Sequence, residues 1–391
     1  MFIENTEDLS RFCEELASSE VLGFDTEFVR ERTYYPSLEV LQLTGGNEIG
    51  VIDCQAIEDL EPLWKLLCDG AALKVVHSGA QDMELILQES GRLPDRVFDT
   101  QIGASFLGYG SQCGYGRLVS DILRKKISKV ETFSDWTRRP LRAEQIEYAE
   151  KDVEHLLELY SRLAGRLEKK ERLSWVEEEC RYLSVPENFR RTPPDECFRK
   201  IKGGNSLDPL PLSNLRSLAE WREIEAQNRN VLPHRVIPDH VLISISKNAP
   251  KDREALKRQR GLHNNEFNRH AEDILQKVRE GTKRSDTDPI EISPRTRSFT
   301  DDEDESVMKL LGAVLKIQAD RARVAPSVLA TTRDLRDLVA GVRTDDLEGQ
   351  RLLSGWRREI AGERLLSVLN GEIALRICPK NGTLLLETVD V

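Results

Sequence analysis

The segment Leu22-Gly23-Phe24-Asp25-Thr26-Glu27-Phe28 places two acidic residues inside an apolar, alternating pattern. Residues two apart on a strand face the same side, so Asp25 and Glu27 share one face, and Leu22, Phe24 and Phe28 point into the opposite layer. Two carboxylates on a buried face repel each other and lose hydration unless a cation lies between them, and hard oxygen ligands favour magnesium or manganese. By itself, the segment is equally compatible with a pair at a sheet edge, with one acid in solvent.

A second candidate segment contains one acid, Asp82, which follows a strand predicted over Leu73 to His77. A turn of small residues comes next, and Asp82 falls in the first turn of a predicted helix. There a carboxylate can cap the helix or face a cleft at the strand ends, and this segment alone favours capping. For His77, hydrogen bonding at the strand end is the simplest interpretation.

A third pattern predicts an amphipathic helix after residue 143, with one apolar stripe formed by Ile146, Ala149, Val153, Leu156, Leu157 and Tyr160. Tyr148 and Asp152 are four residues apart beside this stripe, so both are expected at the edge of a packed interface, where a cleft could form. His155 points further away and is interpreted as a solvated histidine. The helix begins at Arg142-Ala143 without a Ser or Thr cap, which predicts a frayed first turn.

The order of the predicted elements indicates an α/β layered fold with a mixed sheet. Four strands are predicted at 21–29, 38–43, 49–53 and 73–77, with helices at 59–68 and 82–89. From about residue 143 onward the pattern is helical. Two Gly pairs, Gly108-x-Gly110 and Gly114-x-Gly116, do not match a phosphate-binding motif, and we interpret them as a flexible loop beside the active site.

Charge is distributed unevenly along the 391 residues, whose net charge is -11. Residues 1–180 carry 21 basic and 35 acidic residues, whereas residues 181–391 carry 36 and 33. Within the acidic part, the segment 117–142 contains three acids and eight basic residues, one of which is Lys129. We expect this basic cluster to contact a nucleic-acid backbone. No apolar span or secretory leader is recognised, and the seven scattered cysteines predict reduced thiols in a cytoplasmic protein.

Taken together, Asp25-x-Glu27, Asp82 and Tyr148-x-x-x-Asp152 resemble the ordered motifs of the DEDD 3'-to-5' exonucleases with a tyrosine in the third motif. Short segments elsewhere in this part of the sequence resemble those of the ribonuclease D family: Tyr34-Tyr35-Pro36, Asp99-Thr100-Gln101 and 135–141 (DWTRRPL). Leu218 to Leu262 is similar to the helicase-and-ribonuclease-D C-terminal (HRDC) domain, and 307–372 resembles a second, divergent copy.

This resemblance implies a ribonuclease-H-like α/β exonuclease domain, with a mixed sheet flanked by helices, followed by two all-α HRDC-like domains. The expected boundaries are 1–205 for the exonuclease domain, with a core of about 1–170, then 206–285 for the first HRDC domain, 286–306 for a linker and 307–391 for the second. It further implies that two divalent metal ions, Mg²⁺ or Mn²⁺, are held by Asp25, Glu27, Asp82 and Asp152. Tyr148 would position the attacking water.

The implied activity is removal of nucleoside 5'-monophosphates from the 3' end of RNA, chiefly the trailer of precursor tRNA. Phe28, His77, Arg138 and Arg139 are candidate substrate contacts. We expect a monomer without a nucleotide cofactor or a membrane partner. Two alternatives remain open: a 3'-to-5' exonuclease acting on single-stranded DNA, and a noncatalytic RNA-binding scaffold.

Overall fold

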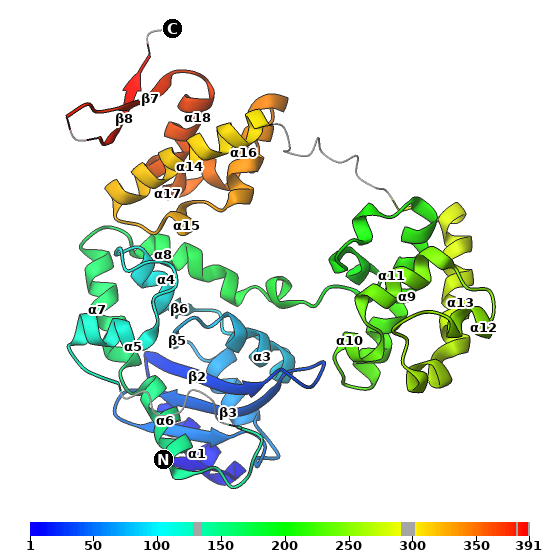
Figure 1. The fold of residues 1–391 in the computed structure, drawn as a ribbon. Coiled ribbons are helices and arrows are strands. Elements are labelled where there is room, and N and C mark those ends of the chain that lie inside the picture. Colours follow the sequence, from blue (N-terminus) through cyan, green and yellow to red (C-terminus); the bar gives the residue numbers. More distant parts are fainter. Residues whose placement is uncertain (128–134, 291–301, 381, 390–391) are drawn as a thin grey trace. The chain divides into compact units, whose positions relative to one another are not determined.

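A computed structural model describes residues 1–127, 135–290, 302–380 and 382–389 of the chain (Figure 1). Contacts divide the chain into two compact units. Unit 1 contains residues 1–27, 40–188 and 296–391, and unit 2 contains residues 28–39 and 189–295. The C-terminal part of the chain (296–391) therefore belongs to the same unit as the predicted exonuclease part (1–27 and 40–188).

A six-stranded mixed sheet lies at the centre of the exonuclease part. Its strands are β1 (Phe2–Ile3), β2 (Val21–Val29), β3 (Ser37–Thr44), β4 (Ile49–Asp53), β5 (Leu73–Val76) and β6 (Val97–Asp99). Their order is β1-β4-β3-β2-β5-β6, so β2 is a central strand. β4 is antiparallel to β3, whereas β1 is parallel to β4, and β5 is parallel to both β2 and β6. The predicted mixed sheet is confirmed, although the short strands β1 and β6 were missed because two or three residues carry no readable alternation.

Helices flank this sheet, as Figure 1 shows. They are α1 (Thr6–Leu16), α2 (Glu61–Trp64), α3 (Ala80–Ser90), α4 (Thr100–Ser105), α5 (Tyr115–Leu118), α6 (Ala143–Glu154), α7 (Leu156–Glu168) and α8 (Leu173–Cys180). α2 and α5 each continue into a π-helical turn, over Lys65–Asp69 and Val119–Leu123. The apolar side chains of β2 that point into the core, Leu22 and Phe24, are fully buried, and each contributes roughly 2 kcal/mol of hydrophobic stabilisation.

Unit 2 is a helical domain that includes the loop between β2 and β3. Its helices are α9 (Pro209–Asn228), α10 (Pro233–Val236), α11 (Asp239–Asn248), α12 (Arg253–Lys257) and α13 (Asn264–Thr287), preceded by short 3₁₀ turns. Trp221 is buried in its core, as expected for an anchor residue. Tyr34 from the loop joins this core, and its hydroxyl donates to Glu223 at 2.5 Å.

The C-terminal part of unit 1 contains α14 (Asp302–Ala322), α15 (Pro326–Leu329), α16 (Thr332–Thr344), α17 (Gly355–Arg357) and α18 (Glu363–Leu369). It ends in an antiparallel hairpin of β7 (Ile373–Ile377) and β8 (Leu384–Thr388). The prediction of an all-α domain over 307–391 was therefore wrong in its last part. Alternating residues such as Leu375 and Leu386 face each other across the hairpin, a period of two that helical periodicity cannot satisfy.

The predicted linker, 286–306, overlaps two helices. α13 extends to Thr287, and α14 begins at Asp302, so the acidic run from Asp302 to Glu305 is helical rather than part of a linker. Asp301 and most of the remaining linker lie outside the described residues. Composition predicted a break here because acidic and small polar residues usually mark solvated chain, but four acids can also occupy the first turn of a helix, where the helix dipole favours them.

Aromatic side chains join the C-terminal part to the exonuclease part within unit 1. The rings of Trp175 and Trp356 stack with centroids 5.4 Å apart, and Phe106 lies edge-on to Trp356 at 4.9 Å. Gly108 also lies at this contact, because a Cβ on it would be 3.4 Å from the carbonyl oxygen of Arg323. The turn at Gly108-x-Gly110 lines a pocket together with residues from 319–327, and its interpretation as a loop beside the active site stays a prediction.

No helix in the described segments is both long and apolar enough to cross a membrane.

Candidate active site

Strand β2 carries the first two acids of the candidate site. Asp25 and Glu27 lie on the same face as Gly23, whose position is so tightly covered that a Cβ there would be 3.1 Å from Leu157 and 3.2 Å from Leu156. Helix α7 therefore packs directly on this face. Only one residue separates the end of α6 from the start of α7. The packing of α7 therefore brings the last turns of α6 next to the acidic end of β2.

Asp82 reaches the site from α3. It is the third residue of that helix and is only 6% exposed. The Thr26 hydroxyl, on β2 between the two acids, donates a hydrogen bond to the Asp82 carboxylate. The Asp82 carboxylate also accepts its own backbone N–H in the first turn of α3, so a capping-type contact and the side-chain hydrogen bond to β2 occur together. Thr26 itself was not singled out from the sequence, because a threonine on a strand is ordinary.

Tyr148 and Asp152 come from α6, one turn apart, and their side chains hydrogen-bond to each other. The Tyr148 ring lies 6.3 Å from the ring of Trp136, which is buried with Leu141, Ala149 and strand residues of β3 and β4. The start of α6 is not frayed as predicted: the Arg142 N–H donates to Gln145 Oε1 at 3.1 Å. A glutamine three residues into a helix can fix its first turn without a Ser or Thr cap.

The four carboxylates form one electrostatic group. Burial raises the pKa of Asp25 well above its usual range, and the nearby charges of Asp82, Asp152 and Glu27 raise it further. The pKa of Glu27 is raised to about 8 by burial and then by Asp152 and Asp82. Burial likewise raises the pKa of Asp152 to about 7 and that of Asp82 to about 6. Each acid is thus penalised for being ionised where it lies.

A divalent cation fits this group on chemical grounds. The donors are hard carboxylate oxygens, and none of the four acids forms a salt bridge with Lys, Arg or His in the described part of the chain. No described basic side chain therefore offsets the repulsion among these acids. Among the described residues no three His, Cys, Asp or Glu side chains form a closed metal-binding group, so the fit rests on donor chemistry and shared charge.

Two of the predicted substrate contacts have partners within the protein. Arg139 pairs with the buried Asp53 at 2.6 Å and so anchors the 135–141 segment on the end of β4. His77 Nδ1 lies 2.9 Å from the Thr100 hydroxyl, which fits its interpretation as a hydrogen-bonded residue at a strand end. Both residues remain predictions as substrate contacts.

The other two candidates are more accessible. Arg138 has a side chain that is 84% exposed and pairs loosely with Asp135. Phe28 follows Glu27 on β2 and is half-buried, with the guanidinium of Arg30 5.6 Å from its ring centre. Part of the predicted basic cluster, including Lys129, lies outside the described residues.

One expectation about α6 was wrong. His155 is not solvated: its side chain is only 14% exposed, and it occupies the break between α6 and α7. Its backbone N–H donates to the Tyr115 hydroxyl at 3.1 Å, and the Tyr115 ring lies 5.6 Å from that of His77. A continuous helix at 100° per residue would have turned His155 outward, and the break changes this direction. Tyr115 was missed, although its place between Gly114 and Gly116 was a usable signal.

Comparisons with known proteins agree with this arrangement. A 3'-5' exonuclease family model matches residues 1–168, and an HRDC domain model matches residues 212–278. A ribonuclease D of Granulibacter bethesdensis is 38% identical over 96% of this chain and 94% of its own length, and one of Nitrobacter hamburgensis is 36% identical over 96% of both. The crystal structure of Escherichia coli RNase D, described as an exoribonuclease involved in structured RNA processing, matches with a TM-score of 0.84 and 28% identity.

That match covers 95% of this chain and 98% of the E. coli chain. One HRDC domain is supported by a family model, and the second HRDC-like copy remains a prediction. The ordered acids on β2, α3 and α6, the mixed sheet and the near full-length similarity place this chain in the ribonuclease D family of 3'-to-5' exoribonucleases.

Proposed function

We propose that this chain removes nucleotides from the 3' end of structured RNAs, chiefly the trailer of precursor tRNA, with the help of two divalent metal ions. The observation that carries the proposal is the group of four acids whose charges are not neutralised by a described basic residue. Asp25, Glu27, Asp82 and Asp152 would hold the ions. When bound, such ions lower the pKa of a water and stabilise the charge that develops on the departing 3' oxygen.

The protein's own groups orient the reaction. The Tyr148 hydroxyl, hydrogen-bonded to Asp152 and with its ring near Trp136, would hold the attacking water. Burial raises the Tyr148 pKa, so the phenol stays protonated and acts as a hydrogen-bond donor. Attack of water on the terminal phosphodiester breaks the bond to the 3' oxygen and releases a nucleoside 5'-monophosphate.

We propose structured RNA as the substrate because of the similarity to relatives, and not because of the geometry of the site. The E. coli relative processes structured RNA, which supports the same substrate class here. The exposed Arg138 is available to contact the RNA backbone. A cytoplasmic location and a monomeric state complete the proposal.

The test is a time course on 5'-labelled precursor tRNA with a 3' trailer, beside a single-stranded DNA of matched length, with Mg²⁺ or Mn²⁺. We expect a ladder that shortens from the 3' end of the RNA, requires the metal and is absent for Asp152→Asn. Faster loss of the DNA would instead favour a DNA exonuclease. Retained RNA binding without cleavage of either strand would favour a noncatalytic scaffold.

A further inference from the structure

Asp99, the last residue of β6, has a buried carboxylate that serves two neighbouring elements. It is 2% exposed. Its Oδ1 accepts the N–H groups of Gln101 at 2.8 Å and Ile102 at 3.4 Å, which caps α4. The same Oδ1 accepts the Ser78 N–H at 3.0 Å, and Oδ2 accepts the Gly79 N–H at 2.9 Å.

The turn that Asp99 holds leads directly to Asp82. Ser78 has φ of +62°, a backbone conformation that costs energy for a residue with a side chain, and α3 has no side-chain cap of its own at Gly79. A Cβ on Gly79 would lie 2.5 Å from Val76, so the turn is tightly folded. Two charge-assisted hydrogen bonds, donated by the Ser78 and Gly79 N–H groups to the Asp99 carboxylate, hold this conformation immediately before the helix begins.

Asp99 is itself held in place from several directions. Val76 and Asp99 are paired in register on the parallel strands β5 and β6. The Thr100 hydroxyl donates to the Val76 carbonyl at 2.9 Å, and the Asp99 N–H donates to Cys180 Sγ at 3.3 Å. The carboxylate is therefore a fixed point against which the turn is positioned.

We propose that Asp99 is a positioning residue that sets where α3 begins and thereby fixes Asp82 relative to Asp25 and Glu27. Thr26 secures the carboxylate of Asp82 from the β2 side, and Asp99 secures its backbone from the β6 side. The inference rests on the proposed function, because it assigns Asp99 a role toward the same metal-binding group. Groups that orient ligands to a metal typically change its affinity by 10- to 100-fold when replaced.

Asp99→Asn removes one of the two contacts to the turn, the bond from the Gly79 N–H, and keeps the Oδ1 contacts to Ser78 and α4. An amide whose oxygen takes the place of Oδ1 still caps α4, but its NH₂ group then faces the Gly79 N–H, and two donors cannot bond. We expect the Mn²⁺ concentration that half-saturates the metal-induced rise in Tm to increase about tenfold. With RNA we expect kcat to fall about tenfold with little change in KM, as misplacement of a catalytic group predicts.

Thr331→Ala is the control for stability. It removes the side-chain cap of α16 in the C-terminal part and should lower Tm while leaving half-saturation by Mn²⁺ unchanged. If Asp99→Asn behaves like Thr331→Ala, Asp99 is only a structural cap, and the inference is wrong.

Asp82→Asn, measured in parallel, separates the inference from the proposed function. Full activity of Asp82→Asn would overturn the proposed function itself. Loss of activity in Asp82→Asn together with wild-type metal binding in Asp99→Asn would overturn only the role of Asp99. Should Asp99→Asn not fold, amide exchange of the wild-type protein decides: Ser78 and Gly79 should exchange as slowly as the β5 amides, and fast exchange would contradict the inference.

Discussion

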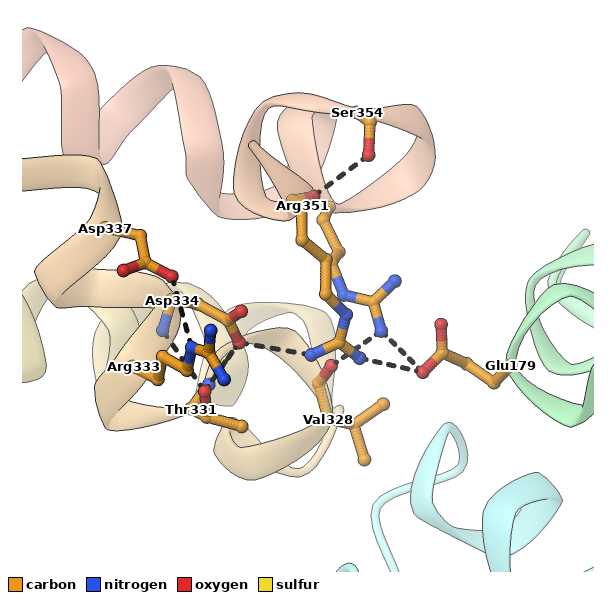
Figure 2. Close-up of polar contacts among 9 residues, drawn as sticks. Glu179, Val328, Thr331, Arg333, Asp334, Asp337, Arg351 and Ser354 are labelled. Atoms are coloured by element: carbon orange, nitrogen blue, oxygen red, sulfur yellow. Dashed lines mark hydrogen bonds and ion pairs between the residues drawn. The ribbon is translucent and has the colours of Figure 1, made fainter. Parts of the chain in front are cut away.

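Two groups of charged side chains lie in unit 1 and differ in how the charge is balanced. The active-site group contains only acids, and burial together with mutual repulsion raises their pKa values. The second group joins α8 to the C-terminal part, where Glu179 accepts from Arg351 at 3.0 Å (Figure 2). Glu179 also pairs with Arg357 at 2.5 Å. Arg351 also pairs with Asp334 at 3.1 Å, so acids and bases alternate.

The direction of the pKa shifts expresses this difference. Asp82 and Asp334 are both shielded acids, yet the pKa of Asp82 is raised to about 6, whereas that of Asp334 is lowered. Burial opposes the lowering at Asp334, but hydrogen bonds from Thr331 and the charge of Arg351 outweigh it. Within a balanced group the opposite charges offset one another's desolvation cost, whereas in an unbalanced group that cost remains until a cation binds, as proposed above.

The largest expected effect tests the function of the unbalanced group. Asp82→Asn should lower turnover on RNA at least about a hundredfold, equivalent to about 2.7 kcal/mol, because one ligand of the catalytic ions is lost. Mn²⁺ should also raise the Tm of the wild type more than that of the variant. Equal Tm shifts in a thermal melt would mean that the ions bind elsewhere, and the contrast between the two groups would lose its functional basis.

Removing one base from the balanced group should instead destabilise the fold. Arg357→Met takes a 3%-exposed guanidinium from Glu179, and we expect the free energy of unfolding to fall by about 2 kcal/mol, since Glu179 keeps Arg351 as a partner. Unfolding in urea measures this change.

Arg358→Met is the matched control for Arg357→Met. The Arg358 guanidinium is 59% exposed, and Glu363 is its only acidic partner among the described residues, so its loss should cost less than about 0.5 kcal/mol. Similar losses in both variants would show that the buried group contributes no more than a surface ion pair.

The smallest expected effect is a pH dependence without metal. Glu27, Asp152 and Asp82 have folded-state pKa values of about 8, 7 and 6, above the ordinary values of 4.5 and 3.8. Protonation therefore favours the folded state, and stability is lost as pH rises above the ordinary pKa values near 4, with the loss complete at about 8.

With metal ions removed by a chelator, lowering the pH from 8 to 6 should raise Tm by a degree or more for each of the three acids. This uses a shift in Tm of about 3 °C for each kcal/mol of unfolding free energy. Glu27→Gln should show a shallower slope, because it removes the group with the highest of the three values. A wild-type slope in this variant would argue that other groups set the pH dependence.

The local sequence pattern was sufficient to predict which candidate site residues lie together when they belong to the same strand or helix. The period of two put Asp25 and Glu27 on one face of β2, and the period of 3.6 put Tyr148 next to Asp152 on α6. Asp82 was found only because its motif resembles a family, since a carboxylate in the first turn of a helix has capping as its simplest explanation.

Tertiary structure decided the features that depend on distant partners. The fold buries His155 at a helix break under Tyr115, places Gly108 against Arg323, and makes Asp99 the support of the Asp82 turn. In each case the partner lies some 20 to 215 residues away in the chain. The periodicity of a sequence does not indicate which distant backbone groups will contact each other.

The sequence by itself determined the α/β class, the acidic face of the catalytic strand and the family, because these depend on spacing within single elements and on ordered motifs. Only the tertiary structure decided that the chain ends in a hairpin and that its C-terminal part forms one unit with the exonuclease part. It also decided which buried charges are balanced. The physical reason is that the free energy of a buried charge depends on what lies within a few ångströms of it, and the folded chain alone brings those groups together.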